Sequence, residues 1–174
     1  MSEPDDQSLV ARAAKGEARA FALLVRRHYG LIYRVAYRWC GDRATAEDVA
    51  QDVCVKLGAA MRGFKGDASF STWLYRVTLN TARDAMRASL RARRQVAAMA
   101  LTAEPAYMPD AEDALTRSQI WRAVQSLPDQ QRDAVLLVFG EEMSHAQAGA
   151  ILGCKEATVS WHIHEAKKRL KRLL

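Results

Sequence analysis

Residues 144–156 read SHAQAGAILGCKE, and this stretch decides the fold of the C-terminal part of the chain. Ser144 and Gln147 form the S-x-x-Q pattern of a capping box, which satisfies free backbone groups at the start of a helix. Gly153 ends that helix, and a second helix is predicted to begin near Glu156 after a tight turn. Two short helices joined by a tight glycine turn are typical of a helix-turn-helix.

The second helix of this pair has two different faces when its residues are placed about 100° apart. We expect the apolar face to pack in the core, and it consists of Val159, Ile163, Ala166, Leu170 and Leu173. The opposite face consists of Ala157, Trp161, His164, Lys168 and Arg172. A large apolar side chain opposite the core, such as Trp161, generally has a binding partner. Residues 165–174 also carry five Lys or Arg and one Glu, so this helix is a candidate for DNA binding.

Helical periodicity continues toward the N-terminus, and no stretch alternates as a strand would. We expect three long helices there, over residues 21–40, 46–59 and from about 72 to 94. Gly41 is expected to end the first of them, and Thr45 is a candidate N-cap for the second. Residues 63–69, GFKGDAS, are rich in turn-forming residues and predict a loop. From residue 114 onward four short helices fit, so the sequence predicts an all-α protein.

The helix over residues 46–59 carries an exposed stripe opposite its apolar face. Its members recur at the i, i+3, i+4, i+7 spacing of one helix face and are Asp48, Gln51, Asp52 and Val55. Spacing alone leaves two interpretations open. The stripe is either a solvated face or a surface on which another protein docks.

The long helix from about Thr72 has an arginine-rich face. Arg76, Asn80, Arg83, Arg87 and Arg94 lie within about 60° of each other on an ideal helix. A face meant only for water normally alternates Lys and Glu, so a row of arginines indicates contact with a polyanion. The preceding loop adds Phe64, Lys65, Phe70 and Trp73, a mixture that suits unstacked single-stranded bases unless the aromatic rings belong to the core.

Charge along the chain separates these two helical regions. The net charge is +6, which by itself indicates an anionic partner only weakly. Residues 104–113 carry four acidic and no basic residues, and Pro105 and Pro109 interrupt any helical period. We therefore expect residues 95–113 to form an acidic, flexible linker between a domain over residues 1–94 and a domain over residues 114–174.

Several classes of protein are disfavoured by the residues present. Three scattered cysteines form neither a disulfide framework nor a zinc knuckle, and His162 and His164 would point in different directions on one helix. We expect no metal site, no cofactor and no catalytic residues, because no phosphate loop, ligand cluster or paired nucleophile and base is present. The acidic N-terminus does not resemble a signal peptide, and no apolar run approaches the roughly 18 residues of a membrane span. We therefore expect a cytoplasmic protein that does not insert into a membrane.

Three further motifs resemble a known family, the group IV or extracytoplasmic function (ECF) sigma factors of the sigma-70 superfamily. AEDVAQDV at residues 46–53 resembles its A-E-D-x-x-Q-D/E-x segment. FSTWLYRVTLNTARD at residues 70–84 resembles F-x-T-W-L-Y-R-I-A-x-N-x-x-x-D, and LPDQQRDAVLL at residues 127–137 resembles L-P-x-x-x-R-x-x-x-x-L. The resemblance implies two small helical domains, a sigma region 2 bundle over residues 1–94 and a sigma region 4 helix-turn-helix over residues 114–174.

The resemblance also implies a function, which is to direct bacterial RNA polymerase to promoters and so to initiate transcription. The stripe of Asp48, Gln51, Asp52 and Val55 would bind the β′ clamp helices of core polymerase, with further contacts to the β subunit. The loop over residues 64–71 would capture a flipped base of the −10 element, and the helix after it would bind the edge and backbone of the −10 duplex. The implied −10 residues are Phe64, Lys65, Ser69, Phe70, Arg76, Asn80, Arg83 and Arg87.

The chain departs from the family pattern in its last helix. The family usually has G-T-V-K-S-R-L-x-R-A, whereas residues 157–166 read ATVSWHIHEA, so three basic positions are Ser160, His162 and Glu165. We hypothesise that Ser160, Trp161 and His164 read the −35 element through hydrogen bonds and contact with thymine methyl groups. The full set expected to bind −35 DNA is Thr158, Ser160, Trp161, His164, Lys167, Lys168 and Lys171. The resemblance finally implies an anti-sigma factor as a partner.

Two other functions remain open on the sequence. A sigma-mimicking module could bind an anti-sigma factor without binding promoter DNA, and the altered residues Ser160, His162 and Glu165 favour it. The intact arginine face argues against it. A stand-alone helix-turn-helix repressor would not need the stripe of Asp48, Gln51 and Asp52.

Overall fold

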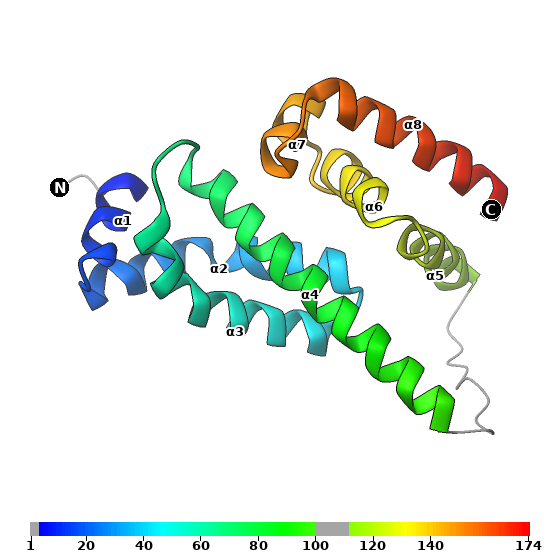
Figure 1. The fold of residues 1–174 in the computed structure, drawn as a ribbon, viewed down its shortest axis with the longest axis horizontal. Helices are drawn as coiled ribbons and strands as arrows, with labels where there is room; N and C mark the ends of the chain where they lie inside the picture. Colours follow the sequence, from blue (N-terminus) through cyan, green and yellow to red (C-terminus); the bar gives the residue numbers. More distant parts are fainter. Residues whose placement is uncertain (1–3, 100–111) are drawn as a thin grey trace. The chain divides into compact units, whose positions relative to one another are not determined.

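The computed structural model describes residues 4–99 and 112–174, and every regular element within them is a helix (Figure 1). The chain divides into two compact units, residues 1–90 and 91–174. The elements of the first unit are α1 (Asp6–Ala14), α2 (Ala18–Cys40), α3 (Arg43–Ala60), the short 3₁₀ helix η1 (Met61–Gly63) and most of α4 (Phe70–Met99). The elements of the second unit are α5 (Glu112–Gln125), α6 (Asp129–Val135), the π-helical turn η2 (Leu136–Gly140), α7 (His145–Leu152) and α8 (Glu156–Leu173). The prediction of an all-α protein is confirmed.

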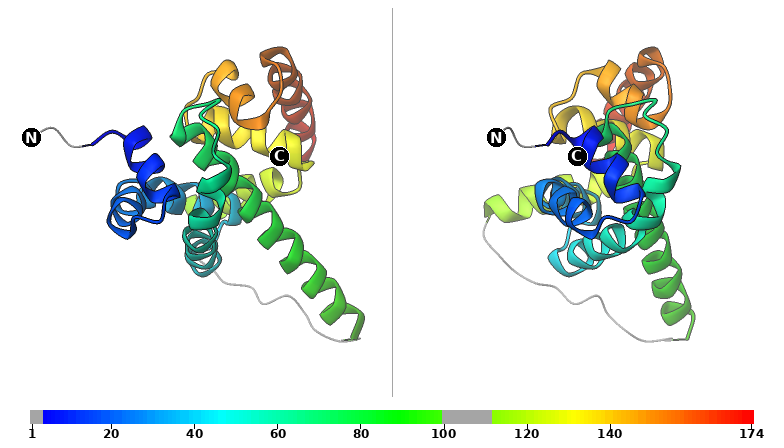
Figure 2. Two further views of the ribbon diagram at one scale, coloured as in Figure 1. Left: turned by 60° about the vertical axis from the view of Figure 1, so that its left-hand side comes forward. Right: turned by 90° about the vertical axis from the view of Figure 1, so that its left-hand side faces the viewer.

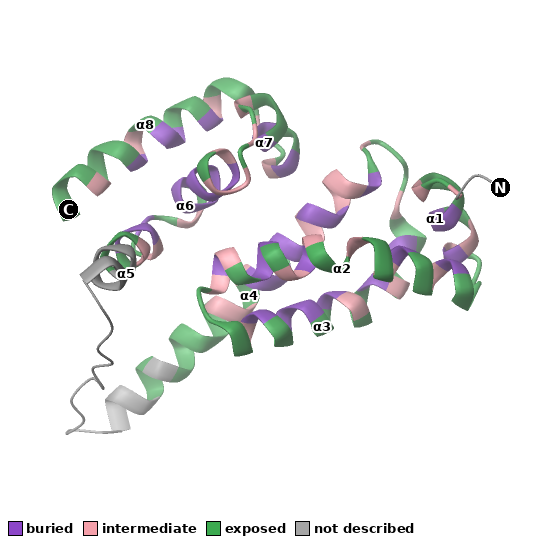
Figure 3. Ribbon diagram, turned by 180° about the vertical axis from the view of Figure 1, so that it is seen from behind, coloured by how far each residue is buried: buried purple, intermediate pink, exposed green. Residues whose placement is uncertain are grey.

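The core of the N-terminal unit lies among α1, α2, α3 and the first half of α4. α2 packs against both α1 and α3. In Figure 1, α4 crosses α2 and α3. Buried residues recur along the length of each helix (Figure 3), and those with no exposure at all include Leu24, Ile32, Trp39, Leu57 and Leu74. Burying one side chain of this kind contributes about 2 kcal/mol, so these positions hold the unit together.

The boundary between α2 and α3 is made by two neighbouring residues. Gly41 adopts a left-handed conformation with φ 79° and ends α2, as predicted. α3 starts earlier than predicted, because the Asp42 side chain accepts a hydrogen bond from the backbone N–H of Thr45 at 2.8 Å. Asp42 is therefore the N-cap, and the prediction that Thr45 caps this helix is wrong.

α1 was not predicted from the sequence. Asp5 caps this helix by accepting a hydrogen bond from the backbone N–H of Ser8 at 2.7 Å. Leu9, Val10 and Ala13 form its buried face against α2 and α3. An aspartate cap followed by apolar residues at i, i+1 and i+4 was the available signal, but it spans only two turns.

α4 begins at Phe70, two residues before the predicted start, and continues through Met99. It extends past the ends of α2 and α3 (Figure 2), and the side chains of residues 87–92 are exposed. The helix thus includes residues 95–99, which we expected in the linker, because no glycine or proline interrupts this stretch. Residues 112 and 113 begin α5, and the remainder of the predicted linker lies outside the described residues.

The C-terminal unit has its own core. Its most buried apolar side chains come from four helices and include Ala134, Leu137, Ala148, Val159 and Ala166. α8 packs against both α6 and α7. The predicted capping box is present, with Ser144 accepting from the Gln147 N–H and the Gln147 side chain accepting from the Ser144 N–H. Gly153 ends α7 in a left-handed conformation with φ 70°, so the helix-turn-helix is confirmed.

Two residues in this unit, Gly149 and Glu142, have an unusual backbone environment or conformation. A Cβ atom added to Gly149 would lie 2.8 Å from the carbonyl oxygen of Cys154, so the turn after α7 passes too close for any side chain. Glu142 has φ 54°, a left-handed conformation that a residue other than glycine rarely adopts. It lies between η2 and α7, where the chain turns back toward α7.

Candidate polymerase and nucleic-acid interfaces

The acidic stripe of α3 is exposed as predicted. Asp48, Gln51 and Asp52 all face solvent, and Val55 is 80% exposed. The opposite face of α3 is buried, which fixes the direction in which the stripe points. Asp52 lies 3.7 Å from the ammonium group of Lys56, which is a weak surface contact. Val55 is thus one exposed aliphatic side chain among polar neighbours, and both interpretations of the stripe stay open.

Four rings pack together where the loop before α4 meets α2. Phe70 lies at the centre, with ring centroids 5.1 Å from His28, 6.0 Å from Phe64 and 5.6 Å from Trp73. Phe70 was expected to contact DNA bases, and in the structure this packing leaves only 5% of its surface exposed. Phe64 and Trp73 are half-buried, and Lys65 is exposed on the loop.

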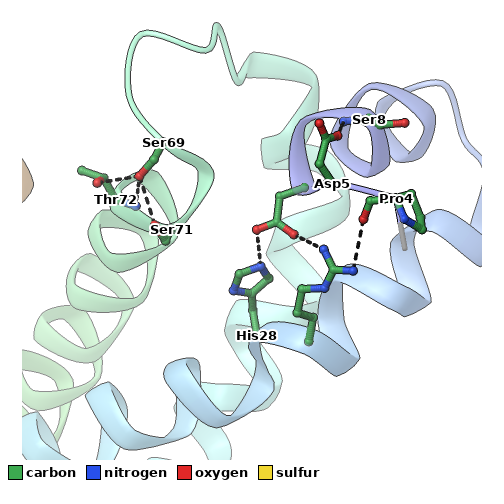
Figure 4. A network of polar contacts seen from close by, with 9 residues as sticks. Pro4, Asp5, Ser8, His28, Ser69, Ser71 and Thr72 are labelled. Carbon is green, nitrogen blue, oxygen red and sulfur yellow. Dashed lines mark hydrogen bonds and ion pairs between the residues drawn. The ribbon is translucent and has the colours of Figure 1, made fainter. Parts of the chain in front are cut away.

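Ser69 was expected to contact DNA, and in the structure it directly precedes α4 and binds its first turn. Its hydroxyl accepts a hydrogen bond from the backbone N–H of Thr72 at 3.2 Å. The same hydroxyl is hydrogen-bonded to the hydroxyls of Ser71 at 3.0 Å and Thr72 at 2.9 Å (Figure 4). This cluster fixes the loop at the point where it enters the helix.

The basic face of α4 is less uniform than the sequence pattern indicated. Asn80 and Arg87 are exposed, and Arg76 and Arg83 are half-buried. Arg83 donates a hydrogen bond to the side-chain oxygen of Asn80 at 3.3 Å. Arg87 lies 3.8 Å from Asp84, an acidic neighbour that the predicted face did not include. Exposed pairs of this kind are weak, so the face can still exchange them for phosphate contacts.

Trp161 points away from the core of the C-terminal unit, as predicted, with 57% of its surface exposed. His164 is also exposed, and Thr158 is half-buried. The hydroxyl of Ser160 is hydrogen-bonded to Nδ1 of His145 at 2.8 Å and donates to the Glu156 carbonyl at 3.2 Å. Ser160 thus links α8 to α7 as well as facing solvent, and any contact with a base would have to share its hydroxyl.

The core face of α8 differs from the prediction within the helix, at His162, and at its C-terminal end. His162 is buried with 7% exposure, whereas Leu173 is 57% exposed and Leu170 only half-buried. The last buried residue of α8 is Ala166, and the residues after it are basic or only partly covered leucines.

The three lysines expected to hold −35 phosphates are all exposed, and they are Lys167, Lys168 and Lys171. Lys167 Nζ lies 5.4 Å above the ring of Phe139. Lys168 donates a hydrogen bond to Glu165 at 3.1 Å, and this bond lowers the pKa of the Glu165 carboxyl. Glu165 therefore stays charged and offsets part of the positive charge on this face.

Other chemical groups in the described residues offer no additional site. Cys40, Cys54 and Cys154 are half-buried and none of them is in a disulfide, and burial raises the pKa of Cys54. No group of three or more His, Cys, Asp or Glu side chains within the described ranges is arranged to hold a metal ion. Of the helices in those ranges, none is both long enough and apolar enough to cross a membrane.

Comparisons with known proteins identify both units. The family model described as Sigma-70 region 2 matches residues 24–94, and that described as Sigma-70, region 4 matches residues 117–170. The RNA polymerase sigma-H factor of Pseudomonas aeruginosa is 31% identical over 188 residues, which cover 100% of this chain and 96% of that protein. The ECF RNA polymerase sigma-E factor of Escherichia coli (strain K12) is 31% identical over 180 residues, which cover 95% of this chain and 92% of that protein.

Solved structures agree with these relatives. CnrH in complex with the cytosolic domain of CnrY has a TM-score of 0.66 and 29% identity, covering 97% of this chain and 96% of that one. The sigma factor RpoE, solved with the anti-sigma factor NepR from Bartonella quintana, has a TM-score of 0.63 at 24% identity. It covers 90% of this chain and 97% of that one, and it supports the fold.

Two helical units, the second built around a helix-turn-helix, together with these matches define a transcription initiation factor of the sigma-70 type. Within that class the chain belongs to the ECF sigma factors, as the resemblance of its motifs implied. Its function is that of a sigma factor, which directs RNA polymerase in promoter recognition.

Proposed function

We propose that the chain gives core RNA polymerase its promoter specificity through three surfaces on three different helices, by binding and without catalysis. The stripe of α3 would bind the β′ clamp helices, with further polymerase contacts to the β subunit. The loop before α4 and the basic face of α4 would open and hold the −10 element. The outer face of α8 would read the −35 element. The observation that carries the proposal is that all three helices direct these polar and basic faces away from the cores of their units.

The assignment of residues follows from this proposal. Sigma region 2 would comprise residues 1–94 and sigma region 4 residues 114–174, with residues 95–113 connecting them. The acidic connection would thread the active-site and RNA-exit channels of the polymerase, where nucleic acid normally runs. A factor that works on cytoplasmic polymerase would itself be cytoplasmic.

Regulation by an anti-sigma factor is part of the proposal. The similar chain CnrH was solved with the cytosolic domain of a second protein, which supports a protein partner here as well. An anti-sigma factor would act by covering the stripe of α3 or the DNA-binding faces of α4 and α8.

A run-off transcription assay tests the proposal directly. The full chain is added to purified core polymerase with the promoter upstream of its own gene as template. We expect a specific transcript that neither component produces alone. If the folded chain yields no specific transcript on this promoter or on any other candidate, yet binds an anti-sigma factor, the sigma-mimicking module replaces the proposal.

A further inference from the structure

The hydroxyl group of Ser160 is held by two hydrogen bonds inside the helix-turn-helix. Its oxygen lies 2.8 Å from Nδ1 of His145, the first residue of α7, and 3.2 Å from the carbonyl oxygen of Glu156, one turn earlier in α8. Ser160 is nevertheless exposed, on the second turn of α8. The N-terminal turns of a recognition helix are the part that reaches the edges of bases. The two internal contacts therefore determine what this hydroxyl can offer to DNA.

The two helices that meet at this hydroxyl are fixed relative to each other. α7 packs against α8 (Figure 1), and the turn between them is closed by the hydrogen bond from the Cys154 N–H to the Gly149 carbonyl at 3.0 Å. His145 is held at the start of α7 by the capping box described above. The fold, and not a flexible loop, thus places the imidazole of His145 beside Ser160.

The proton of the Ser160 hydroxyl is used inside the protein. A hydroxyl group has one proton to donate and two lone pairs that accept. When Nδ1 of His145 carries a proton, it donates to Ser160, and the hydroxyl proton goes to the Glu156 carbonyl. When Nδ1 is unprotonated, the hydroxyl can donate to it instead. In either form of the histidine, Ser160 presents only acceptor lone pairs to solvent.

A group that only accepts hydrogen bonds distinguishes between bases in the major groove. Adenine and cytosine each present an exocyclic amino group, which donates, whereas guanine and thymine present only acceptors for a hydrogen bond there. To donate to guanine or thymine, Ser160 would have to give up an internal hydrogen bond. The net value of one such bond corresponds to about fivefold in an equilibrium constant.

We propose that His145 sets the base preference of Ser160, so that Ser160 accepts a hydrogen bond from the amino group of one adenine or cytosine in the −35 element. His145 is a positioning residue in this proposal, because it acts through Ser160. The inference rests on the proposed function, since it requires the outer face of α8 to lie in the major groove. It adds a residue of α7 to −35 recognition and names the chemical group that Ser160 recognises.

Binding of the full chain with core polymerase to promoter duplexes that each lack one amino group tests the inference. Each −35 adenine or cytosine, on either strand, is replaced in turn by the analogue without its exocyclic amino group. For one replacement, we expect binding by the unaltered chain to weaken about fivefold more than binding by Ser160→Ala. Comparing two proteins on the same duplex removes the effect of the analogue on the DNA itself.

Ser126→Ala is the matched control for Ser160→Ala. It also removes a hydroxyl that donates to a helix carbonyl, that of Ala123 at 2.7 Å, but it lies outside the helix-turn-helix. This variant should respond to every replacement as the unaltered chain does.

Two variants of His145 test its positioning role. His145→Ala leaves the hydroxyl with the Glu156 carbonyl alone, so the effect of the critical replacement should fall to about twofold or less. His145→Asn places an amide where the imidazole Nδ1 lies, and an amide can donate or accept, so it should restore the full effect. Circular dichroism checks that both variants are folded.

The possible outcomes separate the inference from the proposed function. The inference is overturned if no amino group depends on Ser160, or if Ser160 depends instead on a purine N7, an acceptor that 7-deaza analogues remove. A full effect in His145→Ala, or an equal loss in His145→Asn, overturns the role of His145. All three results leave the proposed function standing. Failure of the unaltered chain to bind any promoter specifically with core polymerase overturns both.

Discussion

Gly149 shows how one residue can be required by a turn that follows several positions later. The backbone N–H of Cys154 donates to the Gly149 carbonyl at 3.0 Å, and this bond draws the turn between α7 and α8 across the helix. A glycine inside a helix costs about 1 kcal/mol relative to alanine, so helix propensity alone does not explain a glycine at this position. The structure gives the physical reason for it, since the Cys154 carbonyl leaves no space for a Cβ atom.

Gly149→Ala should therefore lower the free energy of unfolding of the C-terminal unit by about 1–3 kcal/mol, because backbone atoms must shift. Gly58→Ala in α3 is the matched control. Its Cβ would lie 3.8 Å from the ring of Phe21, an ordinary contact, so this variant should gain about 0.5–1 kcal/mol. Urea unfolding followed by circular dichroism measures both. Equal effects of the two substitutions would show that the turn can move away at little cost.

Trp161 is the residue on which −35 recognition depends most in our proposal. Trp161→Ala should reduce transcription from a promoter with an intact −35 element while sparing polymerase binding and −10 opening. Leu173→Ala removes an equally exposed apolar side chain of the same helix, 57% in both cases, and should have little effect. The comparison is made on promoters with intact and with scrambled −35 elements. Equal loss on both, or loss of anti-sigma affinity alone, would assign Trp161 to a protein contact.

Some residue roles could not be predicted because they depend on contacts between distant segments. The sequence places Phe70 in an exposed loop, but in the structure its ring packs edge-on against His28 of α2. Ser160 reads as a free hydroxyl, but His145 of the preceding helix is hydrogen-bonded to it. Periodicity gives the direction of a side chain relative to its own helix, and it cannot show what the neighbouring helix brings to the same place.

At the scale of elements, prediction succeeded where periodic faces and caps coincide. Residues 144–156 provided a capping box, a glycine end and two apolar faces, and the helix-turn-helix is as predicted. Prediction failed where a helix is short, as in α1, and where no breaker separates a helix from its linker, as in residues 95–99. In α3 the apolar face was predicted fully, but two acceptable caps stood close together and Asp42 is the one used.

The stripe of α3 can be tested by charge reversal. Asp48→Lys combined with Asp52→Lys should weaken binding to core polymerase by more than about 1 kcal/mol, because two exposed carboxylates of the proposed interface become cationic. The stability of the chain should change by less than about 0.5 kcal/mol, as is usual for exposed positions. Glu17→Lys reverses an exposed charge of the same unit outside the stripe and serves as the control. Unchanged affinity of the double variant in a titration would make the stripe a solvated face.

The basic face of α4 can be tested through salt dependence. Replacing Arg83 and Arg87 by alanine should weaken promoter binding for all sequences. It should also lower the slope of log affinity against log salt by about 0.9 for each phosphate that the variant no longer neutralises. Arg19→Ala, at an exposed position of α2, should leave that slope unchanged. A slope that stays the same in the double variant would mean that these two side chains do not touch phosphates.

At the scale of the whole molecule, each unit carries different proposed binding surfaces. Each has its own buried core, and the stripe of α3 and the basic face of α4 lie on elements that begin in the first unit. A chain shortened to residues 1–99 should therefore fold, bind core polymerase and lose all dependence on the −35 element. Circular dichroism checks folding, and a pull-down with core polymerase checks binding. A folded fragment that does not bind core would place an essential polymerase contact in the second unit.

The uneven burial of the tryptophans has a spectroscopic consequence. Trp39 has no exposed surface, whereas Trp161 is 57% exposed on the outer face of α8. An indole ring in water emits at longer wavelength than one in an apolar core, so the two fluoresce differently. Each unit thus carries an intrinsic optical probe: Trp39 responds when the first unit melts, and Trp161 responds when something covers α8.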